Sequence, residues 1–225
     1  MTPHSVFVTG ATGYIGRHLI PALLERGHRV RALVRRGSAQ RLASGVEVIE
    51  GDALDAATFA DAVAPADTLV HLIGTPHPGP HKAASFRAVD LPSVDAALTA
   101  ARSGPVRHFV YVSVAQPAPV MRAYIAVREA GETRIRASGV PATLLRPWYV
   151  LGPGHRWPYL CVPFYALFSR LPATREAAQR LGLVTLRQMI DAMVACIEHP
   201  PQAVRIVDVP GIRAASRGVL PPEAA

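Results

Sequence analysis

Three glycines follow one another at three-residue spacing near the start of the chain: Gly10, Gly13 and Gly16. A short β-branched and aromatic run, 6–8, precedes them and predicts a strand, and the apolar pattern over 19–24 predicts a helix after them. A turn in this place can hold a pyrophosphate, because glycines expose backbone N–H groups and the helix N-terminus carries a partial positive charge. The spacing differs by one residue from the commonest dinucleotide fingerprint, but its position favours a nucleotide site over an ordinary turn.

Two adjacent arginines, Arg35 and Arg36, stand about twenty residues beyond the glycines, at the end of a strand predicted over 29–34. Many dinucleotide-binding proteins place an acid here, on the ribose 2′-hydroxyl. Guanidinium groups instead bind a 2′-phosphate bidentately, so these residues favour NADP over NAD, although NAD is not excluded. Two solvated arginines at a strand end are the alternative.

Further residues at the expected strand ends are candidates for contacts with the nucleotide. Asp52 follows Gly51 at the end of the strand predicted over 46–50, where it can contact the adenine or cap the next helix. The other residues expected to contact the cofactor are Thr12, Tyr14, Ile15, Ala53, Leu72, Ile73, Gly74 and Pro147.

The histidines and cysteines give no metal-binding pattern. His71 lies in an apolar strand and is expected to be a hydrogen-bonded core residue. His77 and His81 belong to a proline-rich loop over 74–81 without a third ligand nearby, so this loop is expected to wall the nicotinamide or substrate pocket rather than to bind a metal. The two cysteines, Cys161 and Cys196, are expected to be reduced thiols.

The elements that must position these residues alternate between strand and helix. Strands are predicted over 6–8, 29–34, 46–50, 68–73, 107–112, 142–145 and 204–209, and helices from the glycine turn to 26 and over 55–63, 84–101, 121–137, 157–171 and 185–198. Pro21 and Pro92 fall inside two of these helices and should disturb them locally. The alternation predicts an α/β fold, a doubly wound parallel sheet (Rossmann fold) forming one domain over 1–225, with a small C-terminal cap from 148–200 on the substrate side.

Composition narrows the function classes further. The chain has 225 residues, half of them hydrophobic, and a net charge of +8. Its arginines are dispersed, so no nucleic-acid surface is expected, and no signal peptide or membrane-spanning run is evident, so we expect a cytoplasmic monomer or homodimer. The aromatic stretch 159–171 could lie on a membrane surface, but a buried cap or dimer face explains it better.

Several of these motifs together resemble the atypical short-chain dehydrogenase/reductase superfamily. They are the glycine turn, the basic end of strand 29–34, Gly51-Asp52, Tyr111-Val-Ser113 and the segment 138–147. The similarity covers almost the whole chain. Within the superfamily, the chain most resembles the nitrogen-metabolite-repressor-like and complex I accessory-subunit-like NAD(P)-binding proteins.

The resemblance implies a catalytic serine after the fifth strand and a Tyr-x-x-x-Lys motif on the next helix, where the tyrosine is the acid/base and the lysine holds the nicotinamide ribose. Ser113 matches by position, and Tyr124 and Arg128 match the spacing, with arginine in place of lysine. Four residues apart, the pair shares a helix face, and the guanidinium can stabilise a phenolate, although it need not make the ribose contacts of an ammonium.

Two functions stay open at this point. The first is an NADP-dependent oxidoreductase that acts on a small, fairly hydrophobic carbonyl or related substrate, with Ser113, Tyr124 and Arg128 as catalytic residues. The second is a non-catalytic nucleotide-binding redox sensor or assembly subunit, in which Tyr124 packs on the cap and Ser113 only ends its strand.

Overall fold

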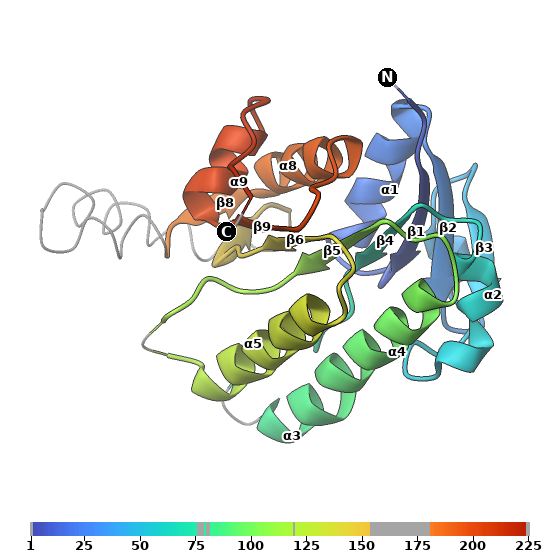
Figure 1. The fold of residues 1–225 in the computed structure, drawn as a ribbon, viewed down its shortest axis with the longest axis horizontal. Helices are drawn as coiled ribbons and strands as arrows, with labels where there is room; N and C mark the ends of the chain where they lie inside the picture. Colours follow the sequence, from blue (N-terminus) through green and yellow to red (C-terminus); the bar gives the residue numbers. More distant parts are fainter. Residues whose placement is uncertain (1, 76–78, 80–81, 119, 154–180, 224–225) are drawn as a thin grey trace, which may run out of the picture.

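The computed structural model describes residues 2–75, 79, 82–118, 120–153 and 181–223. Seven strands form one parallel sheet in the order β3-β2-β1-β4-β5-β6-β9 (Figure 1). Their bounds are β1 (Ser5–Thr9), β2 (Arg29–Val34), β3 (Glu47–Glu50), β4 (Thr68–His71), β5 (His108–Val112), β6 (Ala142–Leu145) and β9 (Val204–Val207). The chain reverses its direction of winding between β1 and β4, which confirms the doubly wound sheet. In such sheets the ligand crevice is expected at the carboxyl ends of these two strands.

Helices cover both faces of the sheet (Figure 1). On one face lie α1 (Gly16–Glu25), α8 (Leu186–Glu198) and α9 (Val209–Ala215), and on the other lie α2 (Ala60–Val63), α4 (Leu91–Arg102) and α5 (Arg122–Ala137). The alternation of side chains along β1 feeds both cores: Val6 and Val8 pack toward α1 and α8, and Phe7 packs toward α2 and α4.

The predicted helix over 84–101 is three pieces: α3 (Ala83–Ser85), a π-helical turn (Phe86–Asp90) and α4. Pro92 has no backbone N–H, and it lies in the first turn of α4, where a helix tolerates proline. The wider π-helical turn just before it takes up the mismatch, and the backbone stays helical from Ala83 to Arg102, so Pro92 disturbs this helix locally, as predicted. The π-helical turn also places Asp90 in the protein interior, where this residue is 1% exposed.

The predicted helix over 55–63 is also divided, into a 3₁₀ turn (Ala56–Thr58) and the single turn of α2. The Thr58 hydroxyl donates to the carbonyl oxygens of Asp55 and Asp52, at 2.8 and 3.1 Å, and Phe59 then leaves helical geometry. Asp55 caps the 3₁₀ turn, since its Oδ1 accepts from the Ala57 N–H at 3.0 Å. The cap is therefore not Asp52, whose Oδ1 accepts from the N–H of Leu54 at 2.9 Å.

Three further boundaries differ from the sequence prediction. β7 (Tyr149–Leu151), which pairs with β8 (Leu183–Thr185), lies where no strand was predicted. The last strand of the sheet ends at Val207, because Asp208 caps α9 by accepting from the Gly211 N–H at 2.8 Å. β4 ends at His71, two residues earlier than predicted.

Some predictions fall on parts of the chain that the structure does not describe. The helix predicted over 157–171, the loop histidines His77 and His81, and Cys161 all lie outside the described residues. Of the cap predicted over 148–200, the described part includes α8, which contributes eight buried residues and packs against α1.

Candidate functional site

The glycine turn is built by close backbone packing at the crevice. Gly10 has φ +72°, and a Cβ there would lie 2.7 Å from the carbonyl carbon of Leu72, at the exit of β4. A Cβ on Gly16 would lie 2.5 Å from the carbonyl oxygen of Ala11. Gly13 is exposed, and a Cβ there would approach only the Gly10 oxygen, at 3.0 Å. Gly10 and Gly16 therefore shape the turn, and Gly13 forms its open surface.

The first turn of α1 is available to an anion. Its N-cap, Ile15, makes no side-chain cap, and the turn carries no acidic residue. Within the described part of the chain, no backbone carbonyl accepts a hydrogen bond from the Ile15 N–H. A helix start with an unengaged N–H next to an open glycine attracts phosphate oxygens.

The two arginines after β2 lie where the sequence predicted the adenosine end of a nucleotide. Arg35 and Arg36 line an open pocket of about 470 Å³ together with Glu50, Gly51 and Asp52, from the end of β3. Arg35, Arg36 and Asp52 are thus brought together as predicted. Glu50 adds a second carboxylate that the sequence analysis did not consider.

The exit of β4 links the nucleotide residues to the catalytic candidates. The Ile73 carbonyl oxygen accepts from Arg128 Nη1 at 3.4 Å. A Cβ on Gly74 would overlap Arg128 Nη2, so a larger residue there would displace the guanidinium. Arg128 therefore lies against the predicted floor of the nicotinamide end of the crevice.

Arg128 is fixed by a buried network. Its Nη2 donates to Asp90 Oδ2 at 3.2 Å, and its Nη1 donates to the Tyr111 hydroxyl and to the Val112 carbonyl oxygen, each at 3.2 Å. Asp90 Oδ1 in turn accepts from the N–H and the hydroxyl of Thr75, both at 2.8 Å. The exposed fractions of the Arg128 and Asp90 side chains are only 5% and 0%, so the network joins α5, the π-helical turn and the ends of β4 and β5 away from water.

The surroundings of Arg128 and Tyr111 shift the pKa of each side chain. Burial would lower the pKa of Arg128, but attraction to Tyr124, Tyr111 and Asp90 outweighs burial and raises it, so the guanidinium stays charged. Burial raises the pKa of Tyr111, while Arg128 opposes the rise, so the Tyr111 side chain stays a neutral phenol at physiological pH.

Tyr124 and Ser113 border the same network. The Arg128 guanidinium carbon lies 5.2 Å from the centre of the Tyr124 ring, and the Phe86 ring packs on the Tyr124 ring at the same centroid distance. Tyr124 is half-buried, so part of its surface is open to solvent. Ser113 Oγ and Arg128 Nε are buried without a hydrogen-bond partner among the described residues. Two unsatisfied groups at the carboxyl end of β5 fit a site that a cofactor and a substrate complete.

Three neighbours of this site were not assigned a role from the sequence: Asp90, Tyr111 and Glu132. Glu132 follows Arg128 by one helical turn and accepts from Arg146 Nε at 2.9 Å and from Gln116 Nε2 at 2.8 Å. Asp90 and Glu132 are acids at apolar-face positions of their helices, and this was the signal available in the sequence.

His71 lies in the core, as the sequence predicted. One ring nitrogen is 2.9 Å from Thr9 Oγ1 and the other is 3.2 Å from Ser93 Oγ. Burial, together with the charge of Arg128, lowers the pKa of His71 to about 3, so the ring is neutral and links β1, β4 and α4.

The described residues contain no group of three side chains arranged to hold a metal ion. Cys196 is a buried thiol whose pKa burial raises to about 12. No helix in the described ranges is long and apolar enough to cross a bilayer.

Comparison with known proteins agrees with this geometry. The profile of a family described as NAD(P)H-binding matches residues 10–156, which include the glycine turn, Ser113, Tyr124 and Arg128. A ceramide reductase from Caulobacter vibrioides is 34% identical over 200 residues, which cover 87% of this chain and 61% of the reductase. A 3β-hydroxysteroid dehydrogenase/Δ5→4-isomerase from Mycobacterium tuberculosis is 35% identical over 115 residues, 48% of this chain and 31% of that enzyme.

The fold also matches solved structures. The Bordetella bronchiseptica enzyme WbmH, solved in complex with NAD+, superposes with a TM-score of 0.69 at 20% identity and covers 92% of this chain and 76% of WbmH. The chain therefore shares this architecture, while it spans less than two thirds of the length of the two enzymes that its sequence matches.

Proposed function

The chain belongs to the NAD(P)H-binding family, and from this premise we propose that it is an NAD(P)-dependent oxidoreductase acting on a small, fairly hydrophobic carbonyl or related substrate. Membership also confirms the resemblance to the atypical short-chain dehydrogenase/reductase superfamily. The observation that carries the proposed activity is the buried Ser113 hydroxyl, which has no partner among the described residues and directly follows Val112, whose carbonyl oxygen accepts from the same Arg128 that lies over the Tyr124 ring.

The residues that would hold the dinucleotide lie along the crevice. The Ile15 N–H at the start of α1, next to the open surface of Gly13, would take the pyrophosphate, and Arg35, Arg36 and Asp52 would take the adenosine end. Leu72, Ile73 and Gly74, at the exit of β4, would border the nicotinamide end. A bound nicotinamide would supply the hydride that reduction requires.

The side chains of the chain itself would handle the substrate oxygen and its proton. Ser113 Oγ would donate a hydrogen bond to that oxygen, and the Tyr124 hydroxyl would give it a proton. Arg128, held in place by Asp90, would stabilise the phenolate left on Tyr124. In this assignment of roles, the Arg128 guanidinium acts as a fixed positive charge.

We propose NADP as the preferred cofactor, with NAD as a weaker alternative. Support comes from Arg35 and Arg36, which line the same pocket and can grip a 2′-phosphate. Glu50 and Asp52 line it too, and their charges oppose the phosphate, so the preference should be moderate.

The hydrophobic character of the substrate is supported by two relatives, one a ceramide reductase and the other a hydroxysteroid dehydrogenase. The predicted cap, with Trp148 and Tyr149 in its described part, offers aromatic surface of the kind that binds uncharged molecules. A lipid-derived ketone is therefore a sensible first substrate to test.

The test separates binding from chemistry. NADPH and NADH binding would be followed by nicotinamide fluorescence, and NADPH oxidation would be assayed with a panel of aldehydes, ketones and quinones that includes long-chain ketones. We expect Tyr124→Phe and Ser113→Ala to bind NADPH as the parent protein does and to lose turnover by about 100-fold or more. Thr133→Ala, which removes an exposed hydroxyl from α5, is the control. Turnover that survives in Tyr124→Phe would refute the assigned role.

A second candidate is a non-catalytic nucleotide-binding sensor or assembly subunit, related to the nitrogen-metabolite-repressor-like or complex I accessory-subunit-like proteins. The observation that favours it is the engagement of Arg128 by Asp90, Tyr111 and two carbonyl oxygens, which differs from the role of a ribose-binding lysine. NADPH binding without turnover on the whole panel, with a partner that co-purifies, would support this candidate over the enzyme.

A further inference from the structure

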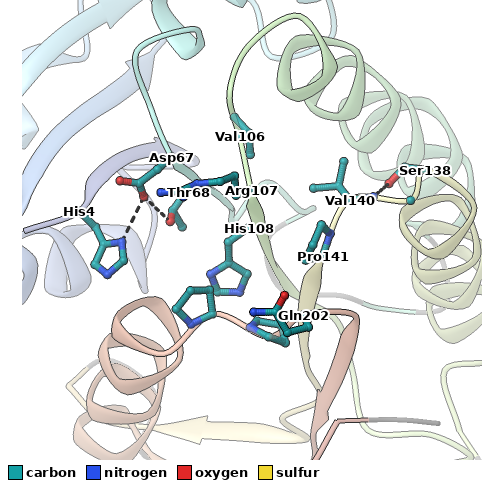
Figure 2. Close-up of a pocket in the computed structure, with 13 residues that line it drawn as sticks. His4, Asp67, Thr68, Val106, Arg107, His108, Ser138, Val140, Pro141 and Gln202 are labelled. Carbon is teal, nitrogen blue, oxygen red and sulfur yellow. Dashed lines mark hydrogen bonds and ion pairs between the residues drawn. The ribbon is translucent and has the colours of Figure 1, made fainter. Parts of the chain in front are cut away.

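A pocket of about 540 Å³ opens at the edge of the sheet where the strands begin, opposite the edge where the nucleotide is expected (Figure 2). It lies between the starts of β4, β5 and β6 and the segment before β9. Its lining includes His4, Asp67, His108, Pro141, Pro200 and Gln202. Its volume is in the range of sites for small organic molecules.

His108, which lines this pocket, has an unsatisfied ring nitrogen. The residue is 1% exposed, and its Nε2 lies 2.9 Å from Thr143 Oγ1. Its Nδ1 is buried without a hydrogen-bond partner among the described residues. A buried polar atom of this kind is rare unless a ligand or water completes it.

The partner of His108 identifies which nitrogen carries the proton. Thr143 is fully buried, and in the described part of the chain its hydroxyl has no other partner than His108 Nε2. A hydroxyl hydrogen needs an acceptor, so Nε2 accepts and the proton resides on Nδ1. Burial, with smaller effects of Arg205 and His4, lowers the pKa of His108 to about 3 against the opposing effect of Asp67, so the ring is neutral. Nδ1 is therefore a neutral N–H donor without an acceptor.

The acid that lines the pocket is already engaged. Asp67 Oδ1 accepts from Thr68 Oγ1 at 2.7 Å and lies 3.2 Å from His4 Nδ1, and both contacts are visible in Figure 2. Asp67 Oδ2 accepts from the Ser5 N–H at 2.9 Å. Arg205, which also lies near His108, pairs with Glu223 at 3.8 Å. Arg107 lines the pocket and has no ion pair with a carboxylate among the described residues, so its guanidinium and the His108 Nδ1–H favour a ligand that brings an acceptor oxygen and a negative charge.

We propose that this pocket is a second binding site, which takes a small organic carboxylate. One carboxylate oxygen accepts the His108 Nδ1–H, and the apolar body lies against Val140 and the prolines Pro141 and Pro200, which line the walls. An inorganic anion would leave these apolar walls uncovered. The site is separate from the nucleotide crevice and does not depend on the proposed oxidoreductase activity.

The probe for the test is benzoate, and its neutral counterpart is benzamide. Titrations would be followed by NMR of the backbone amides and of the imidazole nitrogens of His108. We expect saturable shifts at His108 and Gln202, with a Kd on the order of 1 mM, which is ordinary for a ligand of this size. Benzamide should bind at least tenfold more weakly, and NADPH should still bind in the presence of saturating benzoate.

Two variants and one control complete the test. Gln202→Trp, at an exposed lining position, should fill the pocket and abolish the benzoate shifts, whereas the exposed Gln40→Trp should leave them unchanged. His108→Phe should also abolish them. The proposal is overturned if benzoate does not saturate, if it binds equally well to Gln202→Trp, or if the His108 proton is found on Nε2. If benzoate does not saturate, the His108 Nδ1–H is hydrogen-bonded to a buried water only.

Discussion

Arg128 Nη2 lies 3.2 Å from Asp90 Oδ2, and both side chains are shielded from water. The pair joins the helix that carries Tyr124 to the π-helical turn before α4. Because Arg128 also donates to the carbonyl oxygens of Ile73 and Val112, it holds the chain at the ends of β4 and β5 in place. It also keeps a positive charge beside Tyr124. Positive charge at this position therefore serves structure and chemistry together.

Removing the charge of Asp90 should be costly. In Asp90→Asn, the Arg128 guanidinium stays buried without its counter-charge, and the free energy of unfolding should fall by about 3–5 kcal/mol. The matched control is Asp95→Asn, which breaks the exposed pair with Arg134 and should cost less than about 1 kcal/mol. Urea unfolding of the three proteins measures both effects. Equal losses in the two variants would contradict the structural role of the buried pair.

Replacing Arg128 with lysine should not restore the arrangement of the superfamily. A lysine cannot reach Asp90, Tyr111 and two carbonyl oxygens at once, because it lacks the planar fork. Arg128→Lys should lower the melting temperature and reduce any turnover by about 10- to 100-fold through misplacement of the floor. Arg134→Lys, on the exposed face of α5, is the control. A rise in turnover in Arg128→Lys would show instead that the ammonium reaches the ribose.

Much of the fold could be predicted, because strand and helix periodicities are local. The parallel sheet and the glycine turn follow from such patterns, and the family profile covers the glycine turn and the strands from β2 to β6. A local disturbance of helix 84–101 near Pro92 was predicted, but its form, a π-helical turn that brings Asp90 to Arg128, 38 residues away, depends on long-range contacts and could not be. The pairing of β7 with β8 is likewise a long-range contact without a local signal.

The candidate site was predicted in part. The spacing of Tyr124 and Arg128 placed both on one helical face, and the structure brings the guanidinium over the tyrosine ring. Asp90 was missed because an acid in a helix is usually solvated, and its burial depends on tertiary contacts. The roles of Ser113 and Tyr124 in chemistry, and of the nucleotide-contacting residues, stay predictions.

The glycines should respond differently to alanine. Gly10→Ala combines a positive φ with a clash against Leu72 and should prevent stable folding. Gly27→Ala also has a positive φ, +79°, but no atom within 4 Å of its Cβ, so it should cost only about 1–2 kcal/mol. Gly13→Ala should fold and weaken NADPH binding, since its methyl group would cover the open surface of the turn. Circular dichroism and fluorescence titration measure these outcomes, and unchanged NADPH affinity in Gly13→Ala would argue against pyrophosphate binding there.

The buried histidines should make the protein less stable in acid. His71 and His108 have a pKa of about 3 in the folded state, below the value of about 6.5 expected after unfolding. The unfolded chain therefore binds more protons as the pH falls through 6.5, and stability is lost from there down to about pH 3. Each histidine should lower the free energy of unfolding by about 2 kcal/mol between pH 7 and pH 5. Urea unfolding at both pH values tests the loss, and a His71 imidazole resonance that titrates above pH 5 would contradict it.

Cofactor preference should depend on the pocket formed by the ends of β2 and β3. Arg35→Ala and Arg36→Ala each remove a donor to a 2′-phosphate and should weaken NADPH binding by about tenfold, while NADH binding changes little, because NADH has no such phosphate. Arg35→Glu adds a carboxylate beside Glu50 and should reverse the preference toward NADH. Arg41→Ala, an exposed arginine outside the residues that line this pocket, is the control. Fluorescence titration with both nucleotides gives the ratio of the two Kd values. If the arginine variants weaken both nucleotides equally, Arg35 and Arg36 do not read the phosphate and are solvated residues at a strand end.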